Sequence, residues 1–188
     1  DTARRRVVER LRVGHTPCAP VLSQDGKTLY ICNRFDDDVS FLDLETGKEI
    51  SRVQVQREPV AAALTQDVKF LLVANLLHNG PADADAVAAV ISVIDTVAAK
   101  VAKELRLPNG SGSLNDIRVS PDGKFADVTH ILSRFHLPTT QLDRGWINTN
   151  AKTIVDLECM EVLNTVLLDN VDRGAANPWG AAWSADGK

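Results

Sequence analysis

The side chains in this sequence that could do chemistry are four histidines, together with two arginines and a tryptophan close to the last two of them. Histidine can bind a metal or transfer a proton near neutral pH. A planar guanidinium beside an indole ring is typical of a recognition patch. The residues are His15, His78, His130, Arg134, His136, Arg144 and Trp146. Whether they can act together depends on the elements that carry them.

A short turn sequence that occurs four times organises those elements. Serine or threonine, then an aspartate two residues later, then mostly Gly-Lys, occur at 23–27, 65–69, 120–124 and 184–188. Asp-Gly between two alternating apolar runs predicts a β-hairpin. The sequence therefore predicts one antiparallel unit that is repeated along the chain.

Each unit is predicted to contain four short strands in meander order. Complete units are expected at 17–56, 59–108 and 114–168, the last with a long insert at 131–150 between its second and third strands. Residues 6–13 match the last strand of a preceding unit, and 177–188 match the start of a further one. These patterns predict an all-β fold: a single domain that is a partial β-propeller of about three complete blades plus pieces of flanking blades.

A helix over residues 82–107 is the alternative to two of these strands, because alanine and lysine are plentiful there. The β-branched run at 90–95 falls in register with the strand predicted at 39–43, which favours a strand. A helical turn within 81–89 stays open.

The candidate residues are expected at one end of the blades. In a meander, the connection from the fourth strand to the next unit and the connection from the second strand to the third emerge on the same side. All four histidines fall in or next to such connections. His130 stands where the first two units have Asn33 and Asn75, so it is either a metal ligand or proton-transfer group, or a tolerated replacement.

The insert of the third unit allows two interpretations. Asp143 could pair with an arginine while Trp146 anchors the loop, which would be a purely structural arrangement. Alternatively, Arg134, Arg144 and Trp146 form a recognition patch for a protein partner or an anionic ligand. We expect Arg134, His136, Arg144 and Trp146 to be ordered and to lie on the same face as His15.

Composition and motifs exclude several classes of function. A formal net charge of −4 argues against a duplex nucleic-acid binder, and no apolar stretch approaches the roughly 18 to 20 residues that cross a bilayer. The three cysteines form no CxxC or CxxCH motif, so no zinc knuckle or covalent haem attachment is encoded, and buried free thiols are expected. No catalytic motif is present.

The repeat resembles a known family. The pattern Pro-x5-Ser-x-Asp-Gly-Lys, followed by an apolar strand that ends in Asn33 or Asn75 and by a Val-Ser-Val-Ile-Asp-like strand at 39–43 and 91–95, resembles the YVTN-type repeat of bacterial seven-bladed β-propellers. The insert resembles that of envelope propellers that precede a di-haem cytochrome c peroxidase or MauG-like domain. The resemblance implies a periplasmic or cell-surface location, and haem only on a partner domain absent from this chain.

Two functions follow as hypotheses. The leading one is a non-catalytic binding or scaffold module whose loop face contacts a partner protein or neighbouring domain. The alternative is an enzyme part: the propeller of a redox enzyme, or a lyase-type propeller with His15, His130 and His136 around a metal. Since the predicted blades do not close a ring, we expect a longer native polypeptide of about seven blades, or self-association through open blade flanks.

Overall fold

The computed structural model describes residues 3–134, 138, 147–170, 172, 174 and 177–187. Its strands form three four-stranded antiparallel sheets, each in meander order, so the predicted all-β architecture of blade-like units is confirmed. The first sheet contains β1 (Pro17–Leu22), β2 (Thr28–Asn33), β3 (Asp38–Asp43) and β4 (Lys48–Gln54). The second contains β5 (Pro59–Leu64), β6 (Phe70–Asn75), β7 (Val90–Asp95) and β8 (Lys100–Arg106). The third contains β9 (Ser111–Val119), β10 (Phe125–Ser133), β11 (Asn148–Asp156) and β12 (Glu161–Leu167).

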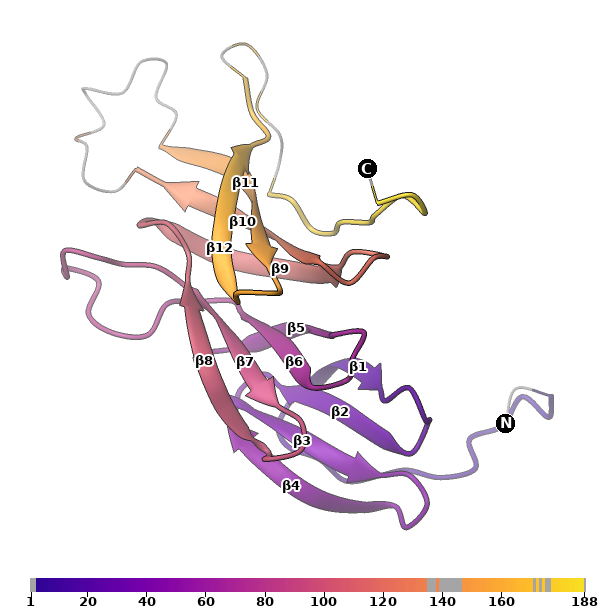
Figure 1. Ribbon diagram of the computed structural model, residues 1–188. Coiled ribbons are helices and arrows are strands. Elements are labelled where there is room, and N and C mark those ends of the chain that lie inside the picture. The colour runs from indigo at the N-terminus through magenta and orange to yellow at the C-terminus, as the bar shows by residue number, and fades with distance from the viewer. Residues whose placement is uncertain are drawn as a thin grey trace.

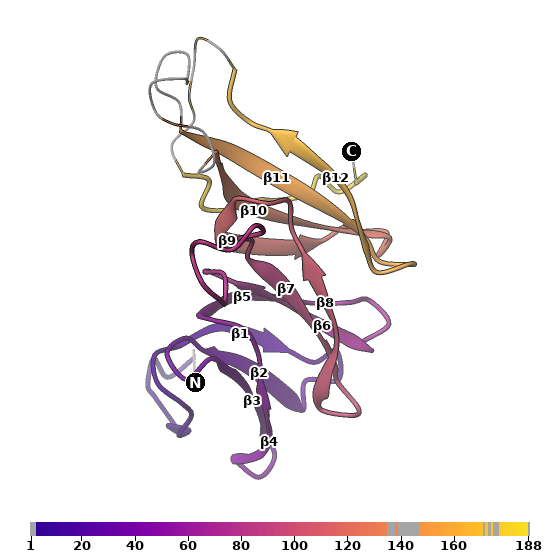
Figure 2. The same ribbon diagram turned by 90° about the vertical axis from the view of Figure 1, so that its left-hand side faces the viewer.

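The three sheets are stacked in chain order (Figures 1 and 2). The first strands of successive sheets lie next to one another, β1 against β5 and β5 against β9, while the fourth strand β8 contacts both β4 and β12 at the outer side. Strands β7 and β8 occupy half of the segment for which a helix was the alternative, and no residue from 82 to 107 is helical, so that alternative is wrong. Among the described residues, no helix is long and apolar enough to cross a membrane.

Alternating side chains of the middle sheet fill both cores. Leu71 and Val73 of β6 pack with the first sheet around Tyr30 and Cys32. Their neighbours Leu72 and Ala74 point the other way, into a second cluster with the third sheet. Successive side chains of a strand face opposite sides of its sheet, so one apolar run supplies two interfaces.

The repeated turn is closed by its aspartate. In the first sheet, Ser23 Oγ donates a hydrogen bond to Asp25 Oδ1 at 2.6 Å, and the Lys27 backbone N–H donates to the same oxygen at 3.0 Å. These bonds lower the pKa of Asp25, with the serine hydroxyl the main cause. The same serine or threonine to aspartate bond recurs at Thr65, Ser120 and Ser184. The repeated sequence therefore builds the same turn four times.

Three predicted boundaries need correction. The strand expected at 6–13 is not formed, because a fourth strand needs a third strand as its hydrogen-bonding neighbour and the described residues supply none for it. The insert expected at 131–150 is shorter, because Ile131 and Leu132 extend β10 and pair with Asn150 and Thr149 of β11. Residues 177–183 do not form a strand.

Residues 177–187 nevertheless follow the third sheet as a first strand would. Cys18, the second residue of β1, points its Sγ to the carbonyl oxygen of Pro59, the first residue of β5, at 3.5 Å. Asn115 Nδ2 donates in the same way to the carbonyl oxygen of Pro178 at 3.0 Å. The segment thus begins beside β9 as β5 begins beside β1.

Candidate functional site

The connections at one end of the sheets form a continuous surface, which we call the loop face. It comprises residues 13–16, 55–58 and 107–110, which precede the first strands of the three sheets, and the described residues between second and third strands, which are 34–37, 76–89, 134, 138 and 147. His15, His78 and Arg134 lie on it, and the long loop between β6 and β7 projects from it (Figure 1). His136, Arg144 and Trp146 lie outside the described residues, so the predicted position of these three stays a prediction.

Hydrogen bonds join the loop face across the sheets. The Glu58 backbone N–H donates to Asp37 Oδ1 at 2.7 Å, and the Leu76 N–H donates to the Glu58 carbonyl at 2.8 Å. Further along, Gly110 N–H donates to the Val87 carbonyl at 2.7 Å. These bonds run from the first sheet to the third, so the loop face is held by the scaffold beneath it.

An exposed phenylalanine lies on this face, in the connection between β2 and β3. Phe35 is 55% exposed, and the His15 ring lies beside it with a centroid separation of 5.5 Å. The guanidinium carbon of Arg34 lies 5.1 Å from the centroid of the phenyl ring, within the range of a cation–π contact. We call His15, Arg34 and Phe35 the Phe35 cluster.

Two carboxylates hold the Phe35 cluster in place. Glu58 Oε2 accepts two hydrogen bonds from Arg34, from Nε at 3.0 Å and from Nη2 at 2.8 Å. Asp36 Oδ2 accepts one from the backbone N–H of His15 at 2.7 Å. Asp37 and Glu58 both adopt left-handed backbone angles, with φ of 57° and 56°, which non-glycine residues adopt at a cost. The cluster is therefore pre-organised rather than merely exposed.

Of the Phe35 cluster, His15 was predicted from the sequence, whereas Arg34 and Phe35 were not. The signal was present: a phenylalanine lies between an arginine and two aspartates in a connection of only four residues between β2 and β3. A connection that short cannot bury an aromatic ring beneath itself, which indicates exposure.

His130 does not lie on the loop face. It lies within β10 and is completely buried, with Nε2 at 2.8 Å from Thr153 Oγ1 and Nδ1 at 3.2 Å from the Ile131 carbonyl. Burial lowers the pKa of its imidazole, so the neutral ring is favoured. Both ring nitrogens already have partners, and this arrangement does not favour the metal-ligand interpretation, nor a lyase-type site shared with His15.

The other candidates do not converge with His15. Among the described residues, no hydrogen bond or ring contact joins His15, His78 and Arg134, and no group of three or more His, Cys, Asp or Glu side chains could hold a metal ion. Beside His78, Asn79 Nδ2 donates to Gln56 Oε1 at 2.8 Å. His15, His78 and Arg134 therefore lie apart from one another on the described part of the loop face.

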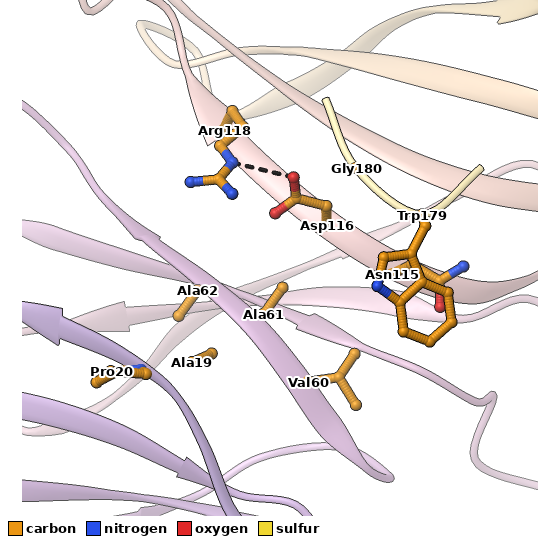
Figure 3. Close-up of a pocket in the computed structure, with 10 residues that line it drawn as sticks. All are labelled: Ala19, Pro20, Val60, Ala61, Ala62, Asn115, Asp116, Arg118, Trp179 and Gly180. Atoms are coloured by element: carbon orange, nitrogen blue, oxygen red, sulfur yellow. Dashed lines mark hydrogen bonds and ion pairs between the residues drawn. The ribbon is translucent and has the colours of Figure 1, made fainter. Parts of the chain in front are cut away.

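A second concave region lies along the first strands and is drawn in Figure 3. We call this hollow of about 390 Å³ the inner groove. Small residues of β1 and β5 form one wall, and polar residues of β9 with the chain at 179–180 form the other. The lining residues are Ala19, Pro20, Val60, Ala61, Ala62, Asn115, Asp116, Arg118, Trp179 and Gly180.

The polar residues that line the inner groove mostly form hydrogen bonds that hold residues 177–187 in place. Asp116 Oδ2 accepts hydrogen bonds from Arg118 Nε and from the Ala181 backbone N–H, both at 3.0 Å. Trp183 Nε1 donates to the Arg118 carbonyl at 3.4 Å. The Trp179 side chain remains 77% exposed at the mouth, and Figure 3 shows its indole apart from the Arg118 guanidinium. We interpret the Asp116–Arg118 pair as structural.

The chain is similar in fold to a solved structure, and about half of its sequence is similar to a known protein. No family model matches the chain. Hydrazine synthase subunit beta of Kuenenia stuttgartiensis is 31% identical over 98 residues, which are 52% of this chain and 25% of that protein. The solved structure of Kuenenia stuttgartiensis hydrazine synthase is similar over 100% of this chain and 64% of its own, with 24% identity and a TM-score of 0.59. The chain thus spans a quarter of the curated relative that it matches, and it shares with the solved structure its fold.

Proposed function

We propose that the chain is a non-catalytic binding module, a propeller-like scaffold that holds a protein partner against its loop face. The observation that carries this proposal is the Phe35 cluster. An aromatic ring that is more than half exposed, flanked by His15 and by an arginine fixed on Glu58, has the composition of an interface hot spot.

The rigidity of the cluster supports the same proposal. Binding is weakened when loops and side chains must first be ordered, and a pre-organised surface avoids that loss. Here the backbone of residues 34–37 is tied to the segment that precedes β1, since the Phe35 N–H donates to the His15 carbonyl at 3.4 Å. It is also tied to the connection that leads into the second sheet, through the hydrogen bond from Glu58 to Asp37. A partner can therefore dock without reshaping this part of the surface.

The kind of partner is suggested by the similarity to a subunit. Hydrazine synthase subunit beta is by name one subunit of an enzyme. By analogy, we propose that this chain serves as the scaffold of an enzyme complex, with the catalytic groups and any haem on another domain or subunit. A periplasmic or cell-surface location belongs to the same proposal.

Crosslinking in the organism that makes the protein tests the proposal. A photoreactive amino acid at position 35 should form a defined adduct with one protein, whereas the same amino acid at Val97 should not. Val97 is 91% exposed in the turn between β7 and β8, at the opposite end of the sheets. Phe35→Ala should weaken binding of the identified protein at least about 30-fold, and Val97→Ala should leave it unchanged. Equal binding by both variants would contradict the proposal.

A further inference from the structure

Two of the three cysteines lie directly opposite each other on neighbouring strands. Cys18 of β1 pairs with Cys32 of β2 in the antiparallel ladder of the first sheet. Cross-strand partners project to the same side of a sheet. Both side chains contribute to the core between the first and second sheets, with Cys32 fully buried and Cys18 partly buried against it.

A β-bulge creates this pairing. Val21 pairs with Tyr30, and an unbroken ladder from that pair would place Cys18 opposite Asn33. The register instead shifts between Cys18 and Val21, where Ala19 adopts a left-handed φ of 47°. One extra residue on the bulged strand moves Cys18 opposite Cys32. The backbone irregularity thus has the effect of bringing two thiols together.

We propose that Cys18 and Cys32 are a site of covalent modification, and that they form a cross-strand disulfide when the folded chain meets a small disulfide oxidant such as oxidised glutathione. Directly opposed residues in an antiparallel pair have Cα separations of about 4.5 or 5.5 Å. Both values fall within the roughly 4.4–6.8 Å that a disulfide spans. The inference is independent of the proposed function.

The reaction proceeds through Cys18, because Cys18 is the more accessible of the two thiols. Its thiolate attacks oxidised glutathione, forms a mixed disulfide and releases one molecule of glutathione. Cys32 then loses its proton and attacks the Cys18 sulfur, which releases the second glutathione. Two electrons pass from the two protein thiols to the oxidant, and the two thiol protons are taken up by the released glutathione thiolates.

Two features of the site shape the rate. In the reduced protein, the Cys18 thiol points to the Pro59 carbonyl oxygen at 3.5 Å, so its side chain must rotate toward Cys32. Burial raises the pKa of the Cys32 thiol, and the nearby Cys18 raises it further. Because the thiolate is the attacking form, this raised pKa slows the second step.

Peptide mapping of the full chain tests the inference. Trypsin cuts after Arg12, Lys27 and Arg34, so each cysteine of the pair lies on its own peptide, at 13–27 and 28–34. After incubation with oxidised glutathione, alkylation and digestion without reductant, these two peptides should appear linked and lighter by two hydrogen atoms than their sum. In the exposed-site variant Cys159→Ser, the thiol count of the denatured protein should fall from two to none.

The contrary results are equally specific. Stable glutathione on Cys18 together with a free Cys32 would overturn the inference, as would a link from Cys18 or Cys32 to Cys159 of another molecule in place of the Cys18–Cys32 bond in the wild type. In the Cys32→Ser, Cys159→Ser double variant, Cys18 should retain glutathione, because no second thiol can displace it. The oxidised wild type should also melt at a higher temperature than the reduced wild type, and this comparison needs no substitution.

Discussion

The Nε2 atom of His130 lies 2.8 Å from Oγ1 of Thr153, and this pair stands where the other two sheets have an asparagine and a serine. Asn33 Nδ2 donates to Ser40 Oγ at 2.7 Å, and Asn75 Nδ2 donates to Ser92 Oγ at 3.0 Å. All three pairs link the second and third strands of a sheet at the same place in the repeat. His130 therefore preserves an internal hydrogen bond of the unit, but with a group that can titrate.

Stability should consequently depend on pH in a window set by His130. Its folded pKa is lowered by burial, so the unfolded chain binds the proton more readily once the pH falls below about 6.5. The contribution of His130 to the free energy of unfolding should be constant above that pH. It should decrease as the pH falls further, until the pKa of His130 in the folded protein is reached. His130→Asn should remove this decrease in urea titrations between pH 7 and 5, whereas His15→Asn should retain it.

Val68 should be a weak point in the repeated turn. It adopts φ of 62° where the other turns have Gly26, Gly123 and Gly187 at 70–74°, and a β-branched residue in this left-handed region is strained. Val68→Gly should raise the free energy of unfolding by about 0.5–1 kcal/mol and Tm by about 2–3 °C. The matched control is Gly26→Val, where the new side chain meets open space. It should lower Tm, and a rise would show that the turn tolerates valine.

The Asp127–Lys152 pair should be costly to break but easy to replace. Lys152 Nζ lies 2.6 Å from Asp127 Oδ2, and the aspartate is completely buried. Lys152→Met should destabilise the protein by about 3 kcal/mol, since the buried carboxylate loses its partner. The double variant Asp127→Leu, Lys152→Ile adopts the residues found at the equivalent positions of the second sheet, Leu72 and Ile91, and should recover most of that loss in chemical denaturation. Additive losses in the double variant would contradict this expectation.

Glu58 should act on the proposed partner only through Arg34. Glu58→Gln removes the charge that fixes the guanidinium beside Phe35 and should weaken binding of the crosslinked partner about three- to tenfold, less than Phe35→Ala. Circular dichroism and Tm should change little, because the pair is partly exposed. An effect as large as that of Phe35→Ala would instead indicate that the partner contacts Glu58 directly.

The sequence predicted the sheets well because their turns are encoded locally. Asp25 and Asp122 each collect their hydrogen bonds from residues within two positions, so a five-residue pattern is enough to identify the turn. The end of β10 was not predictable in this way. Whether Ile131 and Leu132 continue a strand depends on pairing with residues 149 and 150, far along the chain, and this is why His130 was expected at a strand end.

The candidate site could be predicted only in part, because it too depends on contacts between residues that are distant in the sequence. His15 and Arg34 lie in connections that the repeat pattern predicts. Their contact with Phe35 depends on Glu58, which comes from the connection to the following unit and binds Arg34. The Cys18–Cys32 pairing depends on one bulge, and a shift of one residue moves every later side chain to the opposite face. Contacts that depend on the strand register or on residues of a neighbouring unit cannot be predicted from the residue pattern of one unit.

The shared position of the middle sheet has a consequence for how the protein loses its structure. Its side chains enter both apolar clusters, whereas each outer sheet enters one. When each unit interacts only with its neighbours, opening of an end unit breaks one interface and opening of the centre breaks two. In the 188-residue chain, amide hydrogens of β6 and β7 should therefore exchange with deuterium last, and protection should decline toward both ends of the stack.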